Sequence, residues 1–251
     1  MCMSSNCLLL LPTLNEEEAL RALVPEIPSN FSVLVVDGGS TDKTREIAEG
    51  AGCLFMRQQF GKGKGCGVRT AMQYFLQGKH EYLAMIDADY TCDPKELEHL
   101  IERLGHGYHI VLGSRDPQKQ IELLGRFSLF INRLTSGLTT LAYSQHLPDI
   151  QSCYWVFSRK AVETIYPGLS ASGFDIEYDI VFNSWKEGLK IGYCPVTIRP
   201  RKGESKFTKF LRLKQIWFGL TYIYRSLVIM AKRALSGKSR EDETGSPRPE
   251  K

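Results

Sequence analysis

The chain has 251 residues, of which 43% are hydrophobic and 24% are charged. This ordinary globular composition excludes a disordered or fibrous protein, and the length suits one large α/β domain or two small ones. The formal net charge is only +4, yet residues 199–240 carry twelve Lys and Arg side chains against one acidic side chain, Glu204. We therefore expect the C-terminal part of the chain to meet an anion that the rest does not meet.

The cysteine and hydropathy patterns bear on the cellular compartment. Seven scattered cysteines form no Cys-x-x-Cys pair, which favours a reducing compartment over a disulfide framework or a zinc site. The apolar run 8–11 lacks a basic leader and stops at Pro12, so it does not resemble a signal peptide. The run 216–231 is interrupted by Arg225 and is shorter than the ~20 apolar residues that span a membrane. We expect a cytoplasmic protein that lies on the cytoplasmic face of a membrane without crossing it.

Short apolar runs alternate with helical patterns through the first 115 residues. Five runs have the character of buried strands: 7–11, 32–36, 53–56, 82–86 and 109–112. The clearest helix is expected over 93–104, with Asp93 as its N-cap and Glu96 closing a capping box. This alternation predicts a Rossmann-like α/β fold, in which a mostly parallel sheet has helices on both faces. Ligands bind beyond the carboxyl ends of the strands in such sheets.

The second half of the chain is expected to be more helical. One long amphipathic helix is predicted over 123–143, a second helix over 176–187, and a strand over 191–198. Residues 207–235 have apolar side chains at helical spacing with basic side chains around them, which is typical of a helix lying on a membrane, although the apolar stripe can equally pack on the domain. The sequence thus divides into a domain over 1–206, a basic amphipathic C-terminal helix over 207–235, and a disordered tail over 236–251.

Three strand-end loops carry the residues that suggest chemistry. Asp87 and Asp89 follow the fourth strand, and two carboxylates spaced in this way can share Mg²⁺ or Mn²⁺ with the phosphates of a ligand. Asp37 and Gly38 open the second loop, where the backbone allows a flat ligand to approach. Lys64 lies in the glycine-rich third loop at a helix start, which suits a phosphate. Each motif alone is equally typical of an ordinary turn.

A basic loop over 199–206 follows the last strand and completes this group of motifs. Taken alone, such a charge run is usually a solvated surface. Together with the three strand-end loops, it indicates a site for a nucleotide diphosphate and a metal ion, closed by a cationic lid.

Five motifs occur in the order seen in one enzyme family. They are Pro12-Thr13-Leu14-Asn15-Glu16, the run from Val36 to Thr44, Asp87-Ala88-Asp89, Gly113-Ser114-Arg115 and Gly203-Glu204-Ser205-Lys206. Over residues 7–230 the chain resembles glycosyltransferase family 2, and most closely its archaeal dolichol-phosphate (polyprenyl-phosphate) sugar transferase branch. The resemblance implies a GT-A fold, a GDP- or UDP-linked sugar donor, Mg²⁺ or Mn²⁺ as cofactor, and inversion at the anomeric carbon.

The resemblance also implies roles for individual residues. Those that hold the nucleoside are Pro12, Asn15, Glu16 and Asp37. Asp87 and Asp89 bind ribose, metal and diphosphate, Arg115 meets the acceptor phosphate, and Arg201 and Lys206 reach the donor diphosphate or the acceptor. The chain departs from the family pattern at Gly38, where an acidic residue is common, and at Thr91, where many members have Gln.

A phosphate acceptor sets a different chemical problem from a hydroxyl acceptor. A lipid phosphate is already anionic, so it needs cations rather than a general base, and Arg115 and Arg126 are the candidates, with Asn132 or Arg133 as further possibilities. The leading hypothesis is therefore sugar transfer to a polyprenyl or dolichyl phosphate, which supplies lipid-linked sugar for glycosylation.

Two alternatives remain open at this point. The first is transfer to a glycan hydroxyl with Glu177 as the base. The second is a non-catalytic basic protein that binds a membrane or nucleic acid, although no nucleic-acid motif is present and we expect no nucleic-acid partner. The sequence leaves open the sugar, the GDP or UDP base, and the length of the acceptor.

Overall fold

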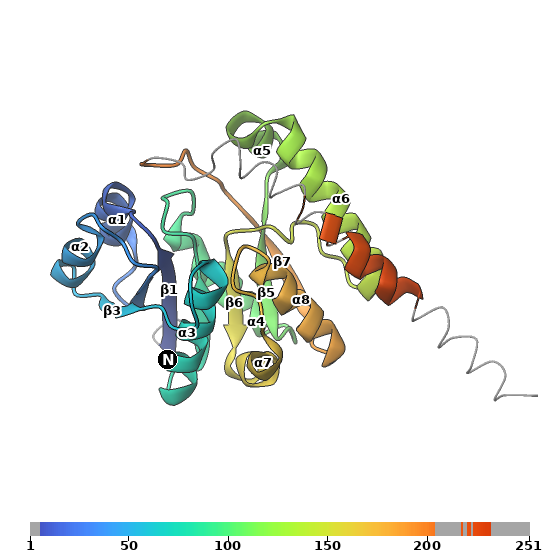
Figure 1. Ribbon diagram of the computed structural model, residues 1–251, viewed down its shortest axis with the longest axis horizontal. Coiled ribbons are helices and arrows are strands. Elements are labelled where there is room, and N and C mark those ends of the chain that lie inside the picture. Colours follow the sequence, from blue (N-terminus) through green and yellow to red (C-terminus); the bar gives the residue numbers. More distant parts are fainter. Residues whose placement is uncertain (1–5, 204–216, 218–219, 222, 232–251) are drawn as a thin grey trace, which may run out of the picture.

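The computed structural model describes residues 6–203, 217, 220–221 and 223–231 (Figure 1). Seven strands form one sheet in the order β3-β2-β1-β4-β6-β5-β7. Only β6 pairs antiparallel with its neighbours, so the prediction of a mostly parallel sheet is confirmed. The strands are β1 (Cys7–Thr13), β2 (Ser32–Asp37), β3 (Leu54–Arg57), β4 (Tyr82–Met85), β5 (Ile110–Arg115), β6 (Trp155–Ser158) and β7 (Ile191–Val196).

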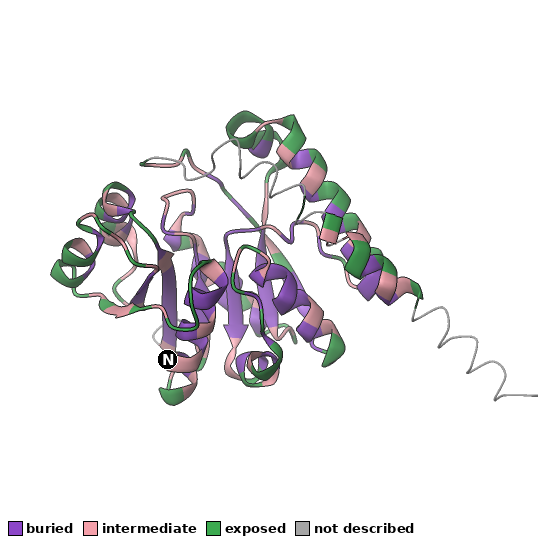
Figure 2. Cartoon of the chain, viewed as in Figure 1, coloured by how far each residue is buried: buried purple, intermediate pink, exposed green. Residues whose placement is uncertain are grey.

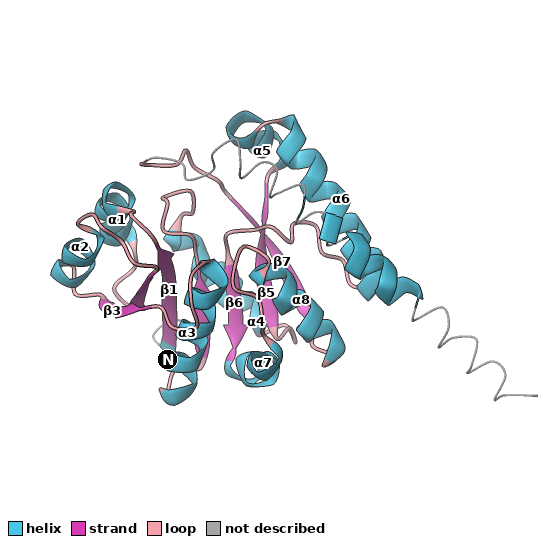
Figure 3. Cartoon of the chain, in the orientation of Figure 1, coloured by secondary structure: helices cyan, strands magenta, loops and turns pink. Residues whose placement is uncertain are grey.

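Helices cover both faces of the sheet, as Figure 3 shows. The α-helices are α1 (Glu17–Leu23), α2 (Thr44–Gly50), α3 (Lys64–Gln77), α4 (Leu97–Leu104), α5 (Pro117–Leu124), α6 (Arg126–Tyr143), α7 (Arg159–Ile165) and α8 (Ile176–Lys186). Short 3₁₀ turns are η2 (Val24–Glu26), η3 (Pro94–Glu96) and η4 (Tyr166–Gly168). The connections that follow β1, β2 and β4 leave the carboxyl edge of the sheet, where the predicted site residues lie.

Alternation along β1 divides the core into two layers. Leu8 and Leu10 point to the face covered by α3, α7 and α8, whereas Leu9 and Leu11 point to the face covered by α1 and α4. All four side chains are fully buried, and Figure 2 shows the central strands as buried throughout. A strand with both faces buried presents a continuous apolar run, which explains why β1 is nearly pure leucine.

Two local predictions were wrong, and one strand was not predicted. The single helix expected over 123–143 is broken into α5 and α6 at Gly125, whose φ of +85° no continuous α-helix allows. Glu96 closes no capping box, because its carboxylate accepts hydrogen bonds from Thr197 on the far side of the sheet edge. Strand β6 was not predicted, since its four residues lie in a segment without clear periodicity.

The C-terminal segment is described only in part. Residues 217, 220–221 and 223–231 are helical, and Ile229 is buried against the core layer of α3 and α8. The rest of the helix predicted over 207–235, the tail over 236–251, and Lys206 lie outside the described residues. Within the described residues, no helix is both long and apolar enough to cross a membrane.

The first turn of α3 lies against the backbone of residues 171–173, and glycine makes this approach possible. A Cβ at Gly65 would lie 2.5 Å from the carbonyl oxygen of Ala171. We expect Gly65→Ala to lower the free energy of unfolding by about 1–3 kcal/mol, because backbone atoms must move to admit the methyl group. The change is measured by urea denaturation.

Gly137 supplies a matched control, since it lies in α6 with no atom within 4 Å of its Cβ position. Gly137→Ala should raise stability by about 0.5–1 kcal/mol. Equal urea midpoints for the two variants would contradict this account of the α3 contact.

Candidate active site

The candidate site lies where the strand order changes direction, beyond the carboxyl ends of β1, β2 and β4. β1 and β4 are parallel neighbours, while the next strand beyond β4 is the antiparallel β6. This geometry directs the loops after β1 and β4 toward a common edge. Glu16 from the first loop and Asp87 and Asp89 from the second therefore come close together.

Asp89 is held by a basic side chain from the loop after β7. Arg201 Nη1 lies 2.9 Å from Asp89 Oδ2, and Arg201 Nη2 lies 2.5 Å from Glu16 Oε1. The other oxygen of Asp89 accepts a 2.6 Å hydrogen bond from the hydroxyl of Thr91. Burial, reinforced by the nearby charge of Asp87, raises the pKa of Asp89. Thr91 thus orients the Asp89 carboxylate. It is Thr91 that stands where the family resemblance predicts Gln.

Asp87 is held by a second basic side chain, Lys64, from the first turn of α3. Lys64 Nζ lies 2.7 Å from Asp87 Oδ1 and 2.7 Å from Glu177 Oε1 on α8. Burial acts to lower the pKa of Lys64, but the two adjacent carboxylates outweigh it and raise that pKa, so the lysine is charged. Burial raises the pKa of Glu177 in spite of its contact with Lys64.

The loop over 199–203 is fixed to the segment that carries Asp89. The Arg199 amide donates to the carbonyl of Thr91 over 2.9 Å, and the Lys202 amide donates to the carbonyl of Asp89 over 3.1 Å. The Lys202 ammonium lies 4.2 Å from the centre of the Tyr90 ring, a cation–π contact. The described part of the predicted cationic lid therefore lies against Asp89, and Arg201 is its side-chain contact with Asp89 and Glu16.

Hydrogen bonds within the loops after β1 and β2 shape the end of the site that is expected to hold the nucleoside. The Asp37 carboxylate accepts from the amides of Gly39 and Ser40 and from the Ser40 hydroxyl. Asn15 Oδ1 accepts a 2.7 Å bond from the Thr41 amide, which joins the loops after β1 and β2. Helix α2 begins at Thr44, after Lys43 at its N-cap position. Asp37 and Asn15 thus fix the walls of this end of the site.

Gly38 has a steric reason to lack a side chain. A Cβ there would lie 3.3 Å from the Thr13 carbonyl oxygen and 3.4 Å from Gln58 Oε1. Gln58 Oε1 is also 3.4 Å from the Cβ position of Gly67 in α3, so its amide occupies a slot between two glycines. Sequence reasoning missed Gln58, and no motif marks it. Pro12 lies beside the same slot, since its Cβ is 3.9 Å from the Cβ position of Gly67.

Arg115 lies in a separate, buried polar cluster. Its Nε and Nη2 atoms lie 2.7 and 2.8 Å from the two carboxylate oxygens of Asp149. Asn132 of α6 donates to the same carboxylate over 2.9 Å, and Gln120 of α5 donates to the Arg115 carbonyl over 3.2 Å. Burial acts to lower the pKa of Arg115, but Asp149 outweighs it and raises that pKa. The cluster ties both helices to the end of β5; sequence analysis missed Asp149 and Gln120.

The structure thus joins most, but not all, of the predicted site residues. Glu16, Lys64, Asp87, Asp89 and Arg201 form one continuous ionic cluster. Arg115 is paired with Asp149 instead, and Arg126 is exposed at the first residue of α6.

Asp87 and Asp89 suit a hard divalent cation, which prefers carboxylate and phosphate oxygens. Within the described part of the chain, no three His, Cys, Asp or Glu side chains are grouped as a metal site. Asp87 and Asp89 would be the carboxylate ligands of such an ion, and phosphate and water oxygens would complete its coordination. That division is the usual one for Mg²⁺ with phosphate ligands, so the residues present fit the predicted cofactor.

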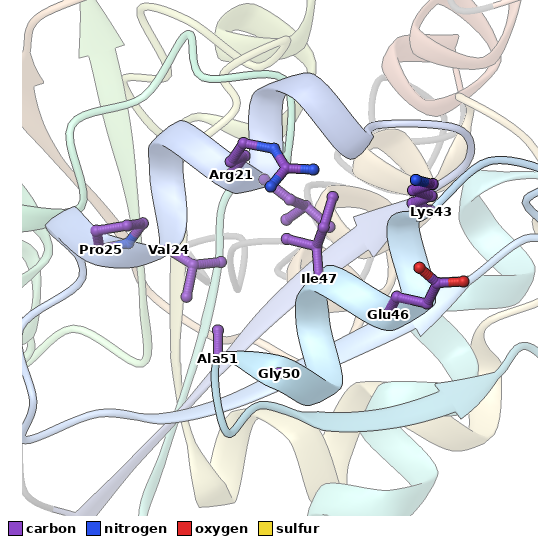
Figure 4. Close-up of a pocket in the computed structure, with 9 residues that line it drawn as sticks. Arg21, Val24, Pro25, Lys43, Glu46, Ile47, Gly50 and Ala51 are labelled. Atoms are coloured by element: carbon purple, nitrogen blue, oxygen red, sulfur yellow. The ribbon is translucent and has the colours of Figure 1, made fainter.

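A shallow pocket elsewhere on the surface does not coincide with this cluster (Figure 4). Its lining comes from α1, η2 and α2: Leu20, Arg21, Val24, Pro25, Lys43, Glu46, Ile47, Gly50 and Ala51. None of the clustered carboxylates lines it, and we place the site at the strand ends on chemical grounds.

Comparison with known families is decisive for the class of enzyme. A model of glycosyl transferase family 2 matches residues 9–166. The chain belongs to this family. The match spans β1 to α7 and includes the loops that carry Glu16, Asp37 and Asp89. Membership of this family weighs against the hypothesis of a non-catalytic basic protein.

Individual relatives agree with the branch that the motifs indicated. The glycosyltransferase AglJ of Haloferax volcanii is 33% identical over 199 residues, which cover 78% of this chain and 64% of AglJ. The dolichol-phosphate mannosyltransferase of Pyrococcus furiosus is 27% identical over 226 residues, which cover 86% of this chain and 62% of that enzyme. The chain thus spans less than two thirds of either relative.

A solved structure confirms the fold. Glucosyl-3-phosphoglycerate synthase from Mycobacterium tuberculosis, crystallised with Mn²⁺ and UDP-glucose, superposes with a TM-score of 0.64 at 19% identity, covering 88% of this chain and 82% of that one. At this level of identity the likeness establishes the GT-A fold.

The buried pair of Arg115 and Asp149 should be important for stability. We expect Asp149→Ala to lower the free energy of unfolding by about 3–5 kcal/mol, because it leaves a buried guanidinium without its counter-charge. Glu122→Ala removes an exposed partner of Lys119 and should change stability by less than about 1 kcal/mol. Thermal or urea unfolding of both variants measures the difference, and similar values would contradict a structural role for Asp149.

Proposed function

We propose that the protein is an inverting, metal-dependent glycosyltransferase that moves a sugar from a GDP- or UDP-linked donor to a polyprenyl or dolichyl phosphate, supplying lipid-linked sugar for glycosylation. The observation that carries the proposal is the ionic cluster at the strand ends, in which two aspartates and two cations face the same edge. Each carboxylate in the described part of this cluster is paired with Lys64 or Arg201. The name of the Pyrococcus furiosus relative supports the acceptor, and the Mn²⁺ and UDP-glucose bound to the tuberculosis enzyme support the donor and cofactor.

The aspartates and cations divide the work on the donor. A divalent ion bound to Asp87 and Asp89 would stabilise the negative charge of the departing nucleoside diphosphate. Lys64 and Arg201 lie beside those carboxylates and can bind the diphosphate oxygens. Asn15, Asp37 and Gly38 form the wall on which the nucleoside is expected to lie.

Glu177 is poorly suited to act as a base toward a hydroxyl acceptor. It is 7% exposed, and its carboxylate is engaged by the Lys64 ammonium at 2.7 Å. A general base must reach the proton that it removes, whereas Glu177 is directed at a cation. A phosphate acceptor needs no such base, which is why the geometry favours it over a glycan hydroxyl.

The surface of α6 supports a lipid acceptor, because this helix exposes large apolar side chains although it buries polar ones beside Leu129, Ala142 and Tyr143. Four polar side chains are buried: Asn132, Thr135, Ser136 and Thr139. Four apolar side chains are exposed: Phe127, Phe130, Leu134 and Leu141. At about 100° per residue, the exposed four fall within an arc of roughly 60°. Figure 2 shows the outer side of α6 as largely exposed.

Such a stripe is the opposite of what a water-facing helix shows. Arg126 and Arg133 are exposed on the same helix, where they can meet lipid phosphates. The described part of the C-terminal helix adds more exposed apolar side chains: Trp217, Leu220, Tyr224 and Leu227. We infer that these helices lie in the headgroup region and bring the acceptor phosphate to Arg126 and toward the end of β5.

The function is tested by supplying the chain with radiolabelled GDP- and UDP-sugars, a polyprenyl phosphate and either Mn²⁺ or Mg²⁺. Label is expected to enter the organic phase with one donor class. Asp89→Ala should lower this transfer at least about 100-fold, since it removes a group that stabilises charge in the transition state. Glu163→Ala, in an exposed pair on α7, is the control and should transfer normally. Transfer by Asp89→Ala at the control rate would refute the role of Asp89.

The membrane contact is tested by sedimentation with vesicles that contain anionic phospholipid. Replacing both Phe127 and Phe130 with Ser should weaken vesicle binding at least about tenfold, because each exposed ring contributes apolar area to the lipid contact. Leu54→Ser changes an exposed residue on β3, at the other edge of the sheet, and should leave binding unchanged. Equal loss in both variants would argue against a specific lipid-facing role for α6.

A further inference from the structure

Each of the two aspartates shares one cation with one glutamate. Arg201 lies between Asp89 and Glu16, at 2.9 and 2.5 Å. Lys64 lies between Asp87 and Glu177, at 2.7 Å from both. The cluster therefore contains four carboxylates and two cations, and each aspartate is already paired with a cation of the protein itself.

Arg201 has hydrogen-bonding capacity to spare. Its Nη1 and Nη2 atoms bind carboxylates, whereas its Nε is buried and has no hydrogen-bond partner. A buried N–H without a partner is uncommon and costs free energy. The guanidinium is thus held in place by charge while one of its donors remains unsatisfied, and a phosphate, with more acceptor oxygens than a carboxylate, would satisfy it better.

We propose that Lys64 and Arg201 are internal counter-ions that move from the two aspartates to the diphosphate of the donor, so that nucleotide and divalent cation bind cooperatively. The inference rests on the proposed function. A divalent cation that binds alone must displace a lysine and an arginine from the carboxylates. A nucleotide diphosphate draws both side chains onto its own oxygens, and the aspartates are then available to the metal.

This exchange gives the two glutamates a role. Glu16 and Glu177 keep Lys64 and Arg201 beside the aspartates, so they are positioning residues rather than proton acceptors. Since coupling between two ligands is reciprocal, the metal must strengthen nucleotide binding by the same factor as the nucleotide strengthens metal binding.

The test measures Mn²⁺ binding to the full chain by the electron paramagnetic resonance signal of free Mn²⁺, with and without saturating UDP or GDP. For the wild type we expect one of the nucleotides to tighten Mn²⁺ binding at least about tenfold, within the usual range of such couplings. Arg201→Met should bind Mn²⁺ alone more tightly than the wild type, and the tightening by nucleotide should shrink at least about threefold.

Three further variants keep the test decisive. Lys202→Met removes the same charge from the same loop, but Lys202 lies over the Tyr90 ring, so its coupling should match the wild type. Arg201→Lys keeps the positive charge but lacks the two-pronged guanidinium, so its tightening of Mn²⁺ binding by nucleotide should lie between those of the wild type and Arg201→Met. This variant keeps the test valid if Arg201→Met folds poorly. Glu177→Gln removes the charge that Lys64 shares with Asp87, so Lys64 pairs with Asp87 alone and Mn²⁺ alone should bind more weakly than to the wild type.

The outcomes separate this inference from the proposed function. Equal coupling in Arg201→Met and Lys202→Met, or unchanged Mn²⁺ binding in Glu177→Gln, overturns the inference. Label transferred to lipid without any such coupling overturns the inference and supports the function. Coupling that depends on Arg201, with no label transferred to polyprenyl phosphate, supports the inference and overturns the proposed acceptor.

Discussion

The repulsion among carboxylates that a parallel sheet brings to one edge is the constraint on which this site depends. Glu16 follows β1, Asp87 and Asp89 follow β4, and α8 adds Glu177. Two like charges about 4 Å apart cost roughly 4 kcal/mol each pair at an effective dielectric of 20. The fold can hold four carboxylates there only because it also delivers cations. Under the proposed function, the same charged groups bind the phosphates and the metal.

Delivery of those cations explains features that otherwise look unrelated. Lys64 reaches Asp87 because α3 begins tight against residues 171–173, which requires Gly63 and Gly65. The same backbone stretch leads into α8 and so fixes Glu177 on the other side of the lysine. Arg201 arrives on a loop that pairs through its backbone with the segment after Asp89. The glycines at the start of α3 and the backbone pairing of the Arg201 loop thus serve the same end, which is to place a cation beside each aspartate.

The sequence was informative about this edge because its signals are local. Periodicity predicted the sheet, strand-end positions predicted that Asp87, Asp89 and Lys64 would converge, and the family resemblance added Glu16. Contacts between distant segments left no such signal. The pairing of Arg115 with Asp149 joins residues 34 positions apart, and nothing in either segment marks the partner. The break at Gly125 was missed for another reason, since the hydrophobic period continues through the residue whose backbone interrupts the helix.

Helix α6 buries polar side chains and exposes large apolar ones, so the end of the site proposed for the acceptor differs in its surface from the end proposed for the donor. Periodicity reports that a helix has two faces, but it does not say which one is buried, and Asn132 and Ser136 turn inward here. Buried polar side chains are tolerable only when their hydrogen bonds are satisfied. Asn132 donates to Asp149, and the Ser136 hydroxyl donates to Asn132 Oδ1. That arrangement leaves the apolar side of α6 exposed, with the Arg115 guanidinium paired to Asp149 at the end of β5. Under the proposed function, the acceptor phosphate stays at headgroup depth, so the enzyme needs cations at the base of an apolar surface, and α6 would provide that combination.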